Sequence, residues 1–276
     1  MTKSREYSQQ VHNESGYILQ FPNIGDAKEL VQNMPPNPYA ESAMQLFPLG
    51  TRLIRGSQEW QYCKAAAVAL ATLGTPIQSA AAIHAEADDD IVVGAASAIG
   101  DYTVTLTSTA NLAAAPLTTK DGFKDGYLIV NDEAGEGQMY KIKSHEAASG
   151  TSNFVVTLYD PLTVALTVAS QVGLHQNECA NVIASAAVVT GVFIGINLIA
   201  ITASYYFWAQ CHGPAPVNAH AAVAKGTGVI IGTTAAKGDP EAANSVDADG
   251  ATEMLIGYPM TPGVADTEKF MVYLIW

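Results

Sequence analysis

Alternation of apolar and polar residues is clearest in the middle of the chain. Four segments show it: Thr103–Thr107, Gly126–Asp132, Gln138–Ser144 and Phe154–Asp160. Turn-forming Gly, Asn and acidic residues separate them, and a period of two between such turns is typical of antiparallel strands. In the third segment the alternation places Tyr140 and Ile142 on one side and two lysines on the other. The pattern predicts a meander of antiparallel strands.

A long uncharged stretch follows the meander, with no Asp, Glu, Lys or Arg between Glu178 and Lys225. It is long enough for a membrane helix, and Gly191 and Gly195 have the GxxxG spacing of packed membrane helices. However, it is rich in β-branched residues, lacks flanking clusters of Lys or Arg, and is broken by Thr, Gly and Asn. We therefore expect no membrane span and predict two central strands, Val188–Ile194 and Leu198–Cys211.

The two ends of the chain have different patterns. Residues 1–50 contain much Asn, Gln and Pro and only scattered apolar residues, which predicts an extended N-terminal arm that becomes ordered on a neighbouring molecule. Residues 268–276 (EKFMVYLIW) predict a strand that is apolar on both faces, in the interior of a sheet or at a covered edge.

These patterns together predict an all-β fold. Strands do not alternate with helical segments, so an antiparallel sandwich or barrel of Greek-key or jelly-roll type is expected. The predicted organisation is an extended arm over residues 1–50 and a β-rich core over residues 51–276. The core divides into a meander at about 100–175 and a C-terminal β part at 180–276.

Composition narrows the possible partners. Apolar residues make up 49% of the chain and charged residues only 14%, where a soluble monomer carries about a quarter. This deficit predicts that other subunits cover part of the surface. The net charge is −13 and the 13 cationic residues are scattered, so no nucleic-acid partner is expected. The polar first ten residues and the three separated cysteines predict a product without a secretory signal, with reduced and mostly buried thiols.

No pattern in the sequence indicates an active site. The acidic turn at 131–137 could attract a hard cation, but it lacks the ligand spacing of a calcium loop and is interpreted as a solvated hairpin turn; whether it binds a cation is left open. The histidines lack metal-ligand spacing, and the glycines of 226–232 do not fit the dinucleotide fingerprint. We expect no enzyme activity, no cofactor and no metal.

Four segments resemble structural proteins of tailed bacteriophages: Phe47–Ala65, Lys124–Ser144, Val156–Thr167 and Tyr205–Val217. The arrangement of an N-terminal arm before a β domain is similar to that of head decoration, or cement, proteins. The resemblance implies a non-enzymatic virion protein, assembled in the host cytoplasm, that lies on the capsid exterior as a homotrimer and bridges neighbouring subunits of the major capsid protein. The candidate partner-binding residues are apolar residues of the arm: Ile18, Leu19, Phe21, Leu46 and Phe47.

Three other classes remain as alternatives. A tail or fibre component would contact the host surface and would have a fibrous repeat, which the sequence lacks. A glycan hydrolase or lyase would need paired carboxylates in a groove, and the acidic clusters of this chain fall in predicted loops. A membrane-anchored protein would use the uncharged stretch as a helix, against its strand-like composition.

Overall fold

The computed structural model describes residues 10–12, 18–20, 36–81, 83–186, 190–220, 222–232, 240–243, 254–263 and 268–276. The chain forms two compact units. The first, here called the sheet unit, comprises residues 1–80 and 178–276; the second, the barrel unit, comprises residues 81–177. The strands of both units pair antiparallel, and the prediction of an all-β fold is confirmed.

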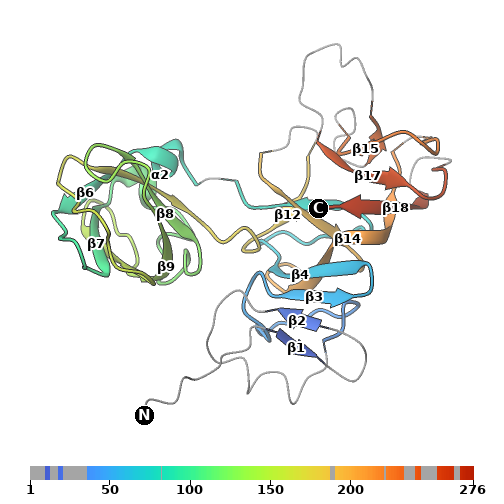
Figure 1. The fold of residues 1–276 in the computed structure, drawn as a ribbon, viewed down its shortest axis with the longest axis horizontal. Helices are drawn as coiled ribbons and strands as arrows, with labels where there is room; N and C mark the ends of the chain where they lie inside the picture. The colour runs from blue at the N-terminus through green and yellow to red at the C-terminus, as the bar shows by residue number, and fades with distance from the viewer. Residues whose placement is uncertain are drawn as a thin grey trace. The chain divides into compact units, whose positions relative to one another are not determined.

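The sheet unit is a single sheet of twelve strands (Figure 1). The strands are β1 (Gln10–His12), β2 (Ile18–Gln20), β3 (Arg52–Arg55), β4 (Gln58–Lys64), β5 (Pro76–Gln78), β12 (Ile183–Ala184), β13 (Phe193–Asn197), β14 (Tyr206–Asn218), β15 (Val229–Ile230), β16 (Glu241–Ala242), β17 (Leu255–Pro259) and β18 (Lys269–Ile275). Their main order is β1-β2-β3-β4-β14-β18-β17-β15-β16, and β13 joins β14 to β5, which also pairs with β12.

The central strand β14 shows where the prediction for the uncharged stretch was right and where it was wrong. The stretch forms β12, β13 and β14. The strand predicted over Val188–Ile194 is displaced, since β13 covers Phe193–Asn197 and residues 187–189 lie outside the described residues. The strand predicted over Leu198–Cys211 is β14, which begins only at Tyr206 because Ser204 turns the chain with φ 64°. It then continues past the predicted end, through Pro214 and Pro216. These prolines lie beyond the last residue paired with β4, so β14 has a strand neighbour there on one side only, where a proline is tolerated. No helix among the described residues is both long and apolar enough to cross a membrane.

The last strand has the predicted alternation. Phe270, Val272 and Leu274 are buried, and β18 lies inside the sheet between β14 and β17, as expected. Trp276 differs from the prediction, since it is 47% exposed instead of buried with the other even-numbered residues. Its indole N–H donates to the carbonyl of Leu255 at 2.9 Å, which holds the ring at the rim of the sheet.

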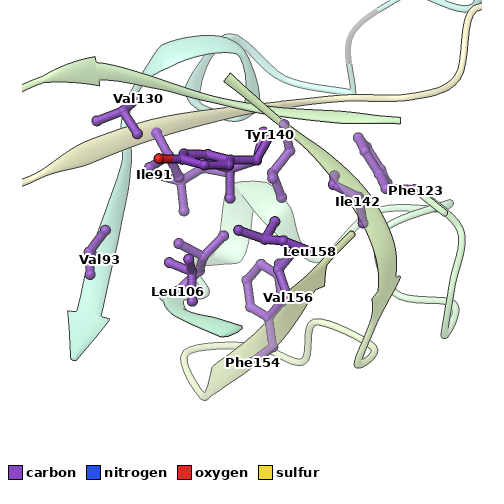
Figure 2. Packing of buried hydrophobic residues seen from close by; sticks show 14 of the residues in the cluster. Ile91, Val93, Leu106, Phe123, Val130, Tyr140, Ile142, Phe154, Val156 and Leu158 are labelled. Atoms are coloured by element: carbon purple, nitrogen blue, oxygen red, sulfur yellow. The ribbon is translucent and has the colours of Figure 1, made fainter. Parts of the chain in front are cut away.

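The barrel unit is a closed barrel of six strands in the order β10-β7-β6-β11-β8-β9. These are β6 (Ile91–Ala95), β7 (Thr103–Thr107), β8 (Tyr127–Asp132), β9 (Met139–His145), β10 (Asn153–Leu158) and β11 (Gln171–His175), with the short helices α2 (Ala85–Asp89) and η1 (Ala110–Leu112). Inward-pointing side chains of Val93, Leu106, Tyr140 and Phe154 fill it (Figure 2). The four strands predicted from alternation are confirmed, and the barrel unit begins earlier than the predicted meander because β6 closes the ring between β7 and β11.

The barrel unit is an insertion within the sheet unit. The chain leaves the sheet after β5 and re-enters it at β12, and these two strands pair with each other through Gln78 and Ile183. The two ends of the insertion therefore start from neighbouring strands. Domain insertions are tolerated where the ends of the inserted segment lie close together, because the host sheet keeps its hydrogen-bonded ladder.

Candidate partner-binding surfaces

The predicted partner-binding residues of the arm pack within the chain's own core wherever the structure describes them. Leu19 of β2 pairs with Leu53 of β3, and both side chains are completely buried. Phe47 is also buried, while Ile18 and Leu46 are partly buried and Phe21 lies outside the described residues. The expectation that this segment lacks a core is corrected at β2, because pairing with β3 supplies an apolar face to pack against.

Phe47 belongs to an aromatic cluster with Tyr62, Tyr206 and Trp208. The ring centroids of Phe47 and Tyr62 are 5.3 Å apart in an edge-to-face arrangement, and Tyr62 lies 4.9 Å from Trp208. The Tyr62 hydroxyl accepts the backbone N–H of Leu46 at 3.1 Å. Burial is the main cause that raises the pKa of Tyr62 to about 12, so this phenol stays protonated. The cluster fastens the segment around Phe47 to strands β4 and β14.

A hollow of about 250 Å³ lies beside this cluster. Its lining includes Pro36, Asn37, Glu41, Leu46, Tyr206 and Trp208. The Glu41 carboxylate accepts hydrogen bonds from the backbone N–H and the hydroxyl of Thr202, at 2.7 and 2.8 Å. The Glu41 carboxylate is therefore already hydrogen-bonded within the chain, and the rest of the lining of the hollow is mainly apolar.

Some of the exposed apolar residues of the sheet unit lie on one face of β14, β17 and β18. Tyr258 is 51% exposed, Met271 39% and Ile275 42%. Register places Tyr258 directly opposite Tyr273, and Tyr273 opposite Pro214, so the three residues share one face of the sheet. Contiguous exposed apolar surface of this kind marks interaction sites. The apolar alternation of residues 268–276 was the sequence signal for it.

The barrel unit has its own exposed apolar side chains. Ile99 is 68% exposed and Met139 63%, and Val168 is exposed as well. The loops around Ile99 and Val168 are neighbours, since Ser97 and Leu166 form an isolated antiparallel bridge. Sequence reasoning did not single out these residues, because they lie in loops whose proximity depends on barrel closure.

The three cysteines are buried, as predicted, and none of them is in a disulfide. Burial is the first cause that raises the pKa of Cys63 well above its usual value, and it raises that of Cys211 to about 12. Since the thiolate is the reactive form, both side chains are poor nucleophiles in the folded chain.

The acidic turn connects β8 and β9 as a hairpin, in agreement with the predicted strand–turn–strand pattern. Asp132, Glu133 and Glu136 are solvent-exposed, and Glu133 adopts φ 63°. In the part of the chain that the structure describes, no group of three or more His, Cys, Asp or Glu side chains is arranged to hold a metal ion.

The hydrogen bonds of His145 define the tautomer of its ring. The backbone N–H of Phe123 donates to Nε2 at 2.9 Å, so the ring proton lies on Nδ1, which contacts the Glu146 carbonyl at 2.6 Å. Burial is the main cause that lowers the pKa of His145 from 6.5. The Glu146 carbonyl and the Asp121 carboxylate act in the opposite direction and raise it in part. Protonation would place a second N–H against the N–H of Phe123.

Acidification is therefore expected to weaken the barrel unit. Because the folded-state pKa of His145 is lowered, its contribution to stability is complete above the unfolded value and is lost as pH falls through the folded value. The melting temperature, followed by far-ultraviolet circular dichroism, should decrease from pH of about 7 to about 5. His145→Gln, whose side chain does not titrate, should show a smaller decrease; equal slopes for both proteins would contradict this role.

Comparison of the chain with protein-family models, with curated proteins and with solved structures gives no match.

Proposed function

We propose that the chain is a non-enzymatic structural protein of a tailed bacteriophage, one that decorates the outside of the capsid and stabilises it by bridging neighbouring major capsid subunits. The observation that supports this most is the combination of low charge with exposed apolar surface. Only 14% of residues are charged, and each unit leaves large apolar side chains in solvent. Such a surface is typical of a protein whose working state is an assembly.

The proposed mechanism depends on repeated burial of apolar area. Each exposed side chain such as Ile99 or Met139 offers about 1.5–3 kcal/mol when fully buried, before the cost of ordering. A single such contact is weak. Many copies that each bridge two capsid subunits make dissociation rare, because release of one contact leaves the others in place.

Packing of Leu19 and Phe47 in the sheet unit changes which residues we assign to the capsid. Side chains that fill the chain's own core are not available to a partner, so we place the capsid contact on exposed apolar residues instead. The loops of the barrel unit around Ile99 and Val168 are the assigned contact. The inserted position of this unit leaves the sheet intact while it binds.

Binding to phage particles tests the proposal. The full chain is mixed with heads, and separately with tails, from a tailed phage that carries this sequence but lacks the protein, and the particles are sedimented. Co-sedimentation with heads, abolished by Ile99→Asp together with Val168→Asp, is the expected result. Thr157→Ala, in strand β10 of the same unit, serves as the matched control and should bind normally. Binding to tails alone would support a tail or fibre component instead, and binding to neither would overturn the proposal.

A further inference from the structure

Three loops of the barrel unit emerge at one end of the barrel, here called the loop end. Neighbouring strands around the ring all pair antiparallel, so the connections β6–β7 (residues 96–102), β8–β9 (residues 133–138) and β10–β11 (residues 159–170) share that end. The second and third loops are joined where the Ser170 hydroxyl donates to the Ala134 carbonyl at 2.8 Å. The chain enters the barrel before β6 and leaves it after β11, both at the opposite end. The loop end therefore carries neither connection to the sheet unit.

Large apolar side chains are exposed on two of these loops. Beside Ile99 and Val168, Tyr102 is 52% exposed and Val164 38%. The two loops run antiparallel to each other, since the N–H of Gly100 donates to the carbonyl of Leu162 at 2.8 Å and Ser97 forms a bridge with Leu166. The four apolar side chains therefore belong to adjacent segments, and exposed apolar residues gathered in this way mark an interaction site.

The charged residues of the loop end are all acidic. The barrel unit holds twelve Asp and Glu residues against four Lys and no Arg, a net charge of −8 out of the −13 of the whole chain. The three loops contain no Lys, Arg or His, and the nearest cation along the strands that reach them is Lys141, inside β9. Five exposed carboxylates lie in the loops or at the end of β8: Asp101, Asp132, Glu133, Glu136 and Asp160.

Three of these carboxylates are available to a partner. Asp101 and Asp132 accept backbone N–H groups of their own loops, those of Ala98 and Glu133. The side chains of Glu133, Glu136 and Asp160 make no hydrogen bond or ion pair with any residue that the structure describes. A partner that covered the apolar side chains without offering cations would bring these carboxylates out of water unpaired, which is costly. An anionic partner, including a second copy of this chain, would be repelled.

We propose that the loop end docks on a basic protein surface, one on which lysine or arginine side chains surround an apolar centre. The inference rests on the proposed function and names the chemistry of the capsid contact within it. Ile99 and Val168 supply the apolar part of the contact. The free carboxylates of Glu133, Glu136 and Asp160 pair with the partner's cations, which speeds the encounter and fixes its orientation.

The salt dependence of head binding tests the inference with the unmodified full chain. Its dissociation constant for heads that lack the protein is measured by co-sedimentation, in EDTA, at sodium chloride concentrations from about 50 to about 500 mM, over which screening becomes strong. The constant should rise at least about tenfold, because salt screens the attraction between carboxylates and cations. Apolar burial alone would give a constant that stays level or falls, since salt does not weaken it.

A pair of variants places the effect at the loop end. Glu133→Gln together with Glu136→Gln keeps the size of both exposed side chains and removes two charges. At the lowest salt concentration it should raise the dissociation constant about three- to tenfold, as expected for two surface charge pairs. Asp89→Asn together with Asp90→Asn is the matched control. It removes the same charge from exposed positions at the opposite end of the barrel and should bind as the unmodified chain does.

The outcomes separate the inference from the proposed function. Head binding that does not weaken with salt, that is lost in EDTA, or that is equally strong for the loop-end variant and its control would remove the inference and leave the proposed function in place. Absence of binding to heads under all conditions would remove both.

Discussion

Removal of Tyr273–Trp276 is expected to unfold the sheet unit. Tyr273, Leu274 and Ile275 end β18 and pair with β14, and the first two also pair with β17; Trp276 follows the strand. Leu274 is completely buried. The deletion would remove a core side chain and break ladder hydrogen bonds on both sides of an interior strand.

The expected loss is a large fraction of the total stability. Truncation of a buried leucine costs about 2–5 kcal/mol, and each lost ladder hydrogen bond adds about 1 kcal/mol. The sum reaches at least about 5 kcal/mol, against a typical total of about 5–15 kcal/mol. Thermal melting followed by the fluorescence of Trp60 and Trp208, both in the sheet unit, measures the effect.

Deletion of Trp276 alone is the control for that experiment. It removes one indole hydrogen bond to Leu255 and a ring contact with Phe193, whose centroid is 5.7 Å away. The ladder and Leu274 remain, so the melting temperature should fall by only a few degrees. If the four-residue deletion melts no earlier than this control, β18 does not hold the sheet together as the structure indicates.

Phe154→Ala is expected to destabilise the barrel unit by about 3–5 kcal/mol, the usual cost of emptying a buried phenylalanine site. Phe154 lies in β10 and points into the barrel beside Leu106 and Val156, where its ring is 1% exposed (Figure 2). In a closed barrel the strands around such a site cannot collapse inward without breaking the ring of hydrogen bonds, so the cavity should persist.

The position of the tryptophans allows the two units to be followed separately. All three, Trp60, Trp208 and Trp276, belong to the sheet unit. Phe154→Ala should therefore lower the melting transition seen by circular dichroism while the transition seen by tryptophan fluorescence moves less. Thr157→Ala, on the outward side of the same strand, should leave both within about 0.5 kcal/mol. Equal shifts in both signals for Phe154→Ala would show that the units unfold as one.

Local pattern was sufficient for part of the fold. Thr103–Thr107 and the alternation of Tyr140 and Ile142 with two lysines predicted β7 and β9 with the correct inward faces. It was insufficient for β6, whose sequence IVVGA is short and is identified as a strand by pairing with β7 and β11. The partner β11 is distant in sequence, and no local pattern records that it will meet β6.

The candidate partner-binding residues were also predicted only in part from the sequence. Leu19 and Phe47 are apolar residues in a proline-rich segment, which by sequence alone predicts an arm. In the structure both residues lie in the core instead. Leu19 pairs with Leu53, more than thirty positions away, and Phe47 contacts Tyr62 and Trp208. By contrast, exposed Met271 and Ile275 belong to an alternation that was apolar on both faces, and the sequence could not say which face would be buried.

The sequence by itself determined the all-β class, the meander strands, the uncharged strands in place of a membrane helix, and the low surface charge. Each follows from composition or from a period of two, which are properties of neighbouring residues. Only the tertiary structure decided that one set of strands closes into a barrel inserted between β5 and β12, and that β2 joins the sheet. It also decided which apolar side chains remain in solvent. The reason is physical: burial depends on which distant segments pack together, and that choice is made by the free energy of the whole chain.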